Sequence, residues 1–138
     1  VGFVTVRLSL ETTNVQRQQA TGGKVDSPSF EQAVDRLQAA GFGPADLGAY
    51  ILAGLPGQPL DEVERTVCWV HSLKVQAKLA LYSPIPGTID AEGVLPPGAD
   101  PLLHNHTVFP YRLGPTHVAE LQRIKQLAKD GNNALLRP

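Results

Sequence analysis

The fold is decided by residues 47–88, which read LGAYILAGLPGQPLDEVERTVCWVHSLKVQAKLALYSPIPGT. The apolar run at 47–53 predicts a buried strand, apolar residues at helical spacing predict a helix over 60–73, and residues 77–82 predict a second strand. A strand, a helix and a strand in this order are typical of a β-α-β unit, in which the two strands run parallel.

Each of these predicted strands is followed by a turn that contains glycine and proline. The first turn is GLPGQ at 54–58, and the second is SPIPGT at 83–88. In parallel α/β folds, ligands bind at the carboxyl ends of strands. Glycine lets a ligand approach the backbone closely, and proline restrains the loop before the ligand arrives. We therefore expect the two loops to form one small-molecule site.

Further predicted elements flank this segment. Residues 3–11 alternate in polarity, which predicts a strand with Thr5, Arg7, Ser9 and Glu11 on its polar face. One helical turn is expected near residues 15–19, and the Asp26-Ser27-Pro28 start predicts a helix that ends at Gly41. A last helix is expected from Pro115 to just before Gly131, and residues 132–138 are expected to fray.

The alternation predicts an α/β chain of three β/α units with parallel strands. Parallel strands that are covered on both faces are usually apolar on both faces, whereas residues 3–11 have one polar face. A TIM-type barrel whose lumen serves as an active site would show that pattern. We assign residues 1–88 to these units and 89–138 to an irregular extension ending in a helix. We expect the loop in this extension to pack over other parts of the protein, because it holds Leu95, Leu102, Leu103, Val108 and Phe109.

Composition excludes several classes of function. The net charge of −1 and the lack of a Lys/Arg cluster argue against direct nucleic-acid binding, and no apolar run is long enough to span a membrane. The single cysteine fits a cytoplasmic protein. Because the chain lacks methionine and opens on an apolar strand, we expect it to be part of a longer protein; removal of an initiator methionine is the alternative.

Five stretches, taken in order, resemble the C-terminal half of a radical S-adenosylmethionine enzyme, in the branch that often carries a cobalamin-binding domain. They are RLSLE at 7–11, SFEQAV at 29–34, Gly41-Phe42, ILAGLPGQ at 51–58 and YSPIPGT at 82–88. The resemblance implies a partial TIM-type barrel. In that family a loop with three cysteines holds a [4Fe–4S] cluster, which reduces S-adenosylmethionine to release a radical.

This chain departs from the family pattern, because its only cysteine, Cys68, lies in a predicted helix, where we expect it to be buried. The resemblance therefore implies a fragment of an oxidoreductase that lacks the cluster-binding N-terminal half and is inactive by itself. Its partners would be that missing half and the adenosyl cofactor, and the use of cobalamin is left open. Self-association is also expected, because half a barrel exposes strand edges.

The resemblance assigns cofactor-binding roles at the strand ends and no catalytic or metal-binding residue. Glu11 would accept hydrogen bonds from the ribose, and Arg7 would pair with Glu11 or with a ligand carboxylate. The remaining positions are Ser9 beside Glu11, Ile51, Gly54, Pro56 and Gly57 around the adenine, and Ser83, Pro84 and Gly87 at its edge. The family often has glutamate where Gln58 stands, so a charge-dependent role there is in doubt.

Other interpretations stay open at this point. Glu11 could be a solvated edge residue, Arg7 could form an ordinary ion pair, and residues 54–58 could be a simple strand-to-helix turn. The whole chain could be a stand-alone, non-catalytic half-barrel that binds a nucleotide-like ligand or a partner protein, or a phosphate-binding enzyme of the TIM-barrel type. His71 and His117 fall on predicted helices, and we expect both on the surface.

Overall fold

The computed structural model describes residues 2, 4–20, 23–95, 97–105 and 113–137. The elements, in chain order, are β1 (Val6–Glu11), α1 (Val15–Ala20), α2 (Ser27–Ala39), β2 (Leu47–Ala53), α3 (Leu60–Ser72), β3 (Gln76–Leu81), the 3₁₀ helices η1 (Ile89–Ala91) and η2 (Pro101–His104), and α4 (Pro115–Leu135). The predicted α/β class is confirmed. Residue 3, where the first strand was expected to begin, lies outside the described residues.

The three strands form one parallel sheet in the order β1-β2-β3. The central strand, β2, is almost entirely apolar, as a strand buried between two parallel neighbours requires. The register pairs Val6 with Leu47 and Gly48 with Gln76, so all three strands start at one edge of the sheet and end at the other.

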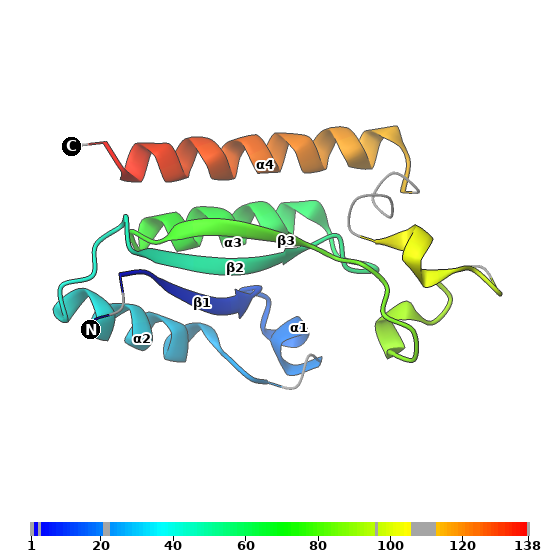
Figure 1. Ribbon diagram of the computed structural model, residues 1–138, viewed down its shortest axis with the longest axis horizontal. Helices are drawn as coiled ribbons and strands as arrows, with labels where there is room; N and C mark the ends of the chain where they lie inside the picture. The colour runs from blue at the N-terminus through cyan, green and yellow to red at the C-terminus, as the bar shows by residue number, and fades with distance from the viewer. Residues whose placement is uncertain (1, 3, 21–22, 96, 106–112, 138) are drawn as a thin grey trace.

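The main hydrophobic core lies between the sheet and three helices, and a smaller cluster of Leu55 and Tyr82 lies apart from it. The main core contains Leu47, Ala49, Ile51 and Ala53 of β2, Phe30 and Val34 of α2, Val63, Val67 and Val70 of α3, and Leu121, Ile124 and Ala128 of α4. Alternate residues of a strand face opposite sides of the sheet, so α2, α3 and α4 all pack on the same face. Figure 1 shows α3 behind the sheet, with α2 and α4 along its two sides.

The opposite face of the sheet carries polar side chains, and we call it the open face. It is defined by Arg7 and Ser9 of β1, Tyr50 of β2 and Lys78 of β3. Ser9 pairs with Tyr50 and Tyr50 pairs with Lys78 in the sheet, so these three side chains lie on the same face. Tyr50 is 48% exposed. The polar side chains predicted for the first strand therefore lie where they meet solvent.

Helix α2 begins as its sequence predicts. The Asp26 side chain accepts a hydrogen bond from the backbone N–H of Ser29 at 2.8 Å, and Pro28 occupies the first turn. Such a cap stabilises a helix by about 1 kcal/mol. It starts the helix at the residue that brings Phe30 and Val34 onto the core.

Helix α4 does not end before Gly131, and that prediction was wrong. The helix continues to Leu135 because Gly131 and Asn132 contact the rest of the fold. A Cβ atom on Gly131 would lie 2.2 Å from the His71 ring, so glycine allows that ring to pack against the helix. Asn132 Oδ1 accepts a hydrogen bond from the Ala77 N–H at 2.8 Å, and Asn132 Nδ2 donates to the Ala77 carbonyl at 2.9 Å.

The extension after β3 lies beyond the carboxyl end of the sheet (Figure 1). Leu102 and Leu103 are 81% and 63% exposed, so the expectation that the loop packs was wrong for these two residues. The local polar turn in which Asp100 caps η2 determines their position instead. Leu95 is half-buried, and Val108 and Phe109 lie outside the described residues. Within the described part of the chain, no helix is both long and apolar enough to cross a membrane.

Candidate ligand site at the carboxyl edge of the sheet

The three strands end at the same edge of the sheet. Glu11 is the last residue of β1, Gly54 follows β2, and residues 82–84 follow β3. The backbone N–H of Tyr82 donates to the Ala53 carbonyl at 2.9 Å, which continues the pairing of β2 and β3 into the loops. The structure thus brings the predicted strand-end residues to one edge, as parallel pairing requires.

Glu11 has an unusual backbone conformation. Its φ angle is +69°, and the pairing of β1 with β2 shifts register between Ser9 and Glu11. Positive φ angles are uncommon outside glycine, and a β-bulge changes the direction of the side chain that it carries. Glu11 and Ser9 line a cavity of about 150 Å³, which Lys24 also borders.

The loop at 54–58 is held by a side chain of its own. Gly54 and Gly57 have φ angles of +87° and +66°, which explains glycine at both positions. Gln58 Oε1 accepts hydrogen bonds from the N–H groups of Gly54 at 2.9 Å and Leu55 at 3.2 Å. The Gly54 N–H therefore already donates a hydrogen bond within the loop, to the side chain of Gln58.

A second cavity, of about 440 Å³, lies over this loop. It is lined by residues 54–58, Val94, Leu113 and His117. His117 lies in the first turn of α4, and its buried Nε2 atom has no hydrogen-bond partner among the residues that the structure describes. An unpaired buried imidazole nitrogen is unfavourable by about 1–3 kcal/mol. The expectation that His117 is an ordinary surface residue was therefore wrong.

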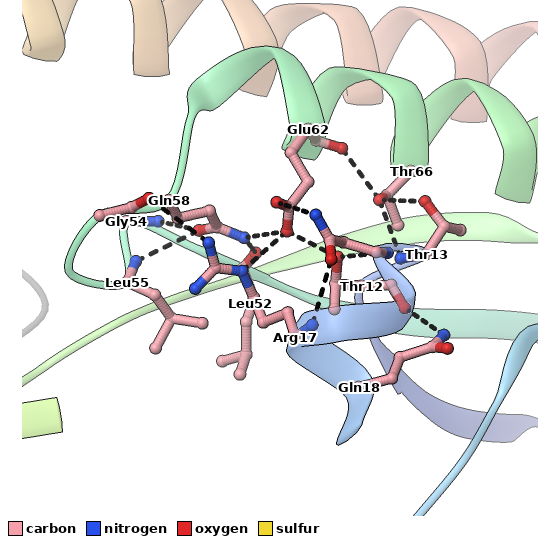
Figure 2. A network of polar contacts seen from close by, with 12 residues as sticks. Thr12, Thr13, Arg17, Gln18, Leu52, Gly54, Leu55, Gln58, Glu62 and Thr66 are labelled. Carbon is pink, nitrogen blue, oxygen red and sulfur yellow. Dashed lines mark hydrogen bonds and ion pairs between the residues drawn. The ribbon is translucent and has the colours of Figure 1, made fainter. Parts of the chain in front are cut away.

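A buried carboxylate joins the loop after β1 to the loop after β2 (Figure 2). Glu62, in the first turn of α3, accepts hydrogen bonds from Thr12 Oγ1 at 2.7 Å, Asn14 Nδ2 at 3.0 Å, Arg17 Nε at 3.0 Å and Gln58 Nε2 at 3.4 Å. We call these five residues the Glu62 network. The side chain of Glu62 is only 4% exposed and that of Arg17 is 21% exposed.

The Glu62 carboxyl stays charged despite its burial. Burial raises its pKa, but hydrogen bonds from Thr12, Arg17 and Gln58, together with the Arg17 charge, lower it by more, so the pKa is below its usual value. The network also explains glutamine at position 58. Gln58 Nε2 donates to the Leu52 carbonyl and to Glu62, whereas glutamate there would place two carboxylates in contact.

Neither Glu62 nor its network was singled out in the sequence. One signal was present. Glu62 and Thr66 are spaced by four residues and lie one position before the buried residues Val63 and Val67, so both fall at the edge of the buried stripe. Thr66 Oγ1 is likewise buried and bonds to Thr13.

The other predicted site residues are dispersed. The Arg7 guanidinium donates to the Val6 and Asp46 carbonyls at the opposite, amino edge of the sheet, and Ile51 is fully buried in the core. Pro56 and Gly57 line the 440 Å³ cavity with Gly54. After β3, Ser83 is half-buried, Pro84 is buried and Gly87 is exposed. The edge therefore holds two hollows, one at Ser9 and Glu11 and the other at residues 54–58.

Comparisons with known proteins leave the chain without an assigned family. No protein-family model matches the sequence, and no curated protein matches it at a significant level. The geometry of the carboxyl edge therefore has to be interpreted by itself.

Proposed function

We propose that this chain is the carboxyl-terminal part of a radical S-adenosylmethionine oxidoreductase and that its carboxyl edge holds the adenosyl group. The observation that carries the proposal is the arrangement of the three β/α units. Sequential parallel strands with every core helix on one face are what a segment of a TIM-type barrel presents, with the open face toward the lumen. Resemblance of the strand-end sequences to that family supports the same conclusion.

The two hollows suit the two parts of an adenosine. Glu11 presents a carboxylate that accepts hydrogen bonds from the ribose hydroxyls, and its bulged backbone directs it to the smaller hollow. The larger hollow, of about 440 Å³, lies within the size range of small-molecule pockets, and Leu55, Val94 and Leu113 give it apolar walls for a flat base. The Glu62 network holds the two loops at a fixed separation.

The residues of this chain do not fit the iron–sulfur cluster. Three thiolates hold such a cluster in the family, whereas the chain has one cysteine. Cys68 is exposed on α3, so the expectation that it is buried was wrong; it lies one position past the buried stripe of that helix. The cluster and the radical step would belong to another part of a longer, cytoplasmic protein, and the chain by itself is proposed to be inactive.

The proposal is tested by titrating the chain with adenosine and S-adenosylhomocysteine in a calorimeter. Both should bind saturably, and Glu11→Gln should weaken binding about tenfold or more, since hydrogen bonds to a charged group contribute about 1.5–3 kcal/mol. The matched control is Glu31→Gln, on the exposed surface of α2, which should bind as the parent does. Binding of 2′,3′-dideoxyadenosine should be weak in the parent and unchanged by Glu11→Gln.

Two results would contradict the proposal. If dideoxyadenosine bound as tightly as adenosine, Glu11 would not contact the ribose. If neither adenosine compound bound, the edge would not be an adenosyl site. A brown, cluster-loaded chain after reconstitution with iron and sulfide would overturn the conclusion drawn from the single cysteine.

A further inference from the structure

A further hollow lies away from the carboxyl edge. It is a groove of about 540 Å³ between β3 and the second half of α4, and it meets the open face at Tyr50. Lys78 enters it from β3, and Lys125 and Lys129 enter it from α4. We call it the lysine groove.

The three lysines have no acidic partner in the described part of the chain. Ion pairs among the described residues involve Arg17, Arg65 and Arg123 and none of these lysines, and the described lining of the groove contains no aspartate or glutamate. Lys78 and Lys125 are half-buried and Lys129 is exposed, and no acidic residue in the described lining of the groove balances their charge. Lys125 and Lys129 are also spaced by four residues, a spacing at which like charges destabilise a helix.

The ordinary explanation for lysines late in a helix does not apply here. A helix dipole favours cations within the last turn only. Since α4 continues to Leu135, Lys129 is six residues before the end of the helix and Lys125 is further still. The cluster therefore has no explanation in the stability of α4.

An exposed aromatic ring completes the groove. Tyr50 lies directly across from Lys78 in the β2–β3 pairing and is 48% exposed. Flat rings of this kind provide stacking surfaces for nucleobases, whatever the base, and ammonium groups bind phosphate. Tyr50 thus offers a surface for a base, and the lysines from β3 and α4 offer ammonium groups for phosphates.

We propose that the lysine groove binds a free nucleoside phosphate, with its phosphates on Lys78, Lys125 and Lys129 and its base against Tyr50. The same chemistry could be offered by a nucleic-acid strand, but the overall charge of −1 provides no extended basic surface for one. The inference does not depend on the adenosyl proposal, because it uses neither Glu11 nor residues 54–58.

The experiment uses uridine compounds, which keep it separate from any adenosine site. Titration of the chain with UTP and with pyrophosphate should give saturable binding, and uridine should bind far more weakly than either. The double variant Lys125→Gln/Lys129→Gln should weaken UTP binding at least tenfold. Tyr50→Leu should weaken UTP binding about fivefold or more and should leave pyrophosphate binding nearly unchanged. Glu11→Gln should leave UTP binding unchanged.

The control variant removes the same charge elsewhere. Lys74 and Arg36 are exposed and lie outside the groove. The double variant Lys74→Gln/Arg36→Gln should therefore bind UTP as the parent does. If this control weakened binding as much as the groove variant, only diffuse charge would be involved and the site would be refuted. Tighter binding of a twelve-nucleotide oligouridine than of UTP would overturn the free nucleotide in favour of a strand. No binding of UTP or pyrophosphate would refute both.

Discussion

Polar side chains hold the fold together in two regions, and the two regions differ in charge. At the carboxyl edge, the ionised Glu62 collects four donors from the loops after β1 and β2. On the outer side of β3, the neutral amide of Asn132 pairs with both backbone groups of Ala77. The charged contact joins two loops at the carboxyl edge, whereas the neutral contact attaches a helix to a strand edge.

This difference has an energetic reason. A strand edge offers one N–H and one C=O, which an amide matches without a net charge. The two loops present several donors to one point, and a carboxylate is the side chain that accepts from many donors at once. Because a buried charge is favourable only while its donors remain, the Glu62 network should be more costly to break.

The largest effect is expected for Glu62→Ala. It removes the charged acceptor that Thr12, Arg17 and Gln58 share, so we expect a loss of about 3–5 kcal/mol in unfolding free energy. Urea denaturation followed by circular dichroism measures it. Glu31→Ala, on the exposed face of α2, is the control and should change stability by less than about 0.5 kcal/mol. Equal effects of the two substitutions would show that the network contributes no special stability.

Acid should break the same network without a mutation. The folded-state pKa of Glu62 is below its usual value of 4.5, so its stabilising contribution is complete above that pH and is lost as pH falls through the lowered folded value. Unfolding free energies of the parent and of Glu62→Gln, measured from pH 7 to pH 3, should converge toward low pH. Parallel curves would mean that Glu62 does not titrate with folding.

At the neutral contact, Asn132→Ala should reduce stability by about 1–3 kcal/mol, because it removes two hydrogen bonds to Ala77. Hydrogen exchange of the Ala77 amide should become faster, because Asn132 Oδ1 is its acceptor. Asn133→Ala, one residue further along the exposed surface, is the matched control. An unchanged exchange rate at Ala77 would contradict the edge-pairing role.

The smallest effect is expected for Gly131→Ala, and its sign should depend on His71. In the parent, the new methyl group meets the His71 ring, and the resulting strain outweighs the helix preference of alanine, for a net loss of about 1 kcal/mol. In a His71→Ala background the same substitution should stabilise by up to about 1 kcal/mol. Destabilisation of both backgrounds would mean that the His71 ring is not the reason for glycine.

Locally determined features were predicted well. The bounds of β2 and α3 match the predicted ranges closely, because an apolar run and a helical stripe each carry their own signal. The Asp26 cap is equally local. At Gly131 the local rule failed, since glycine served there for close packing against His71 and not for ending a helix.

The site was predicted only in part. Parallel pairing placed Glu11 and Gly54 at one edge, as the β-α-β pattern implies. Three features of the edge depend on contacts between residues that are distant in sequence. They are the two separate hollows, the buried Nε2 atom of His117 and the position of Arg7 at the opposite edge of the sheet. No single-sequence pattern specifies such contacts.

By itself, the sequence determined the order of strands and helices, the parallel sheet and the apolar stripes that form its core, because hydrophobic periodicity and turn residues act over a few neighbours. Only the tertiary structure decided which polar groups meet. It brought Glu62 to the loops, Asn132 to the edge of β3 and three lysines to one groove. The reason is that a hydrogen bond or a charge cluster depends on positions in space that chain segments reach only after the core has packed.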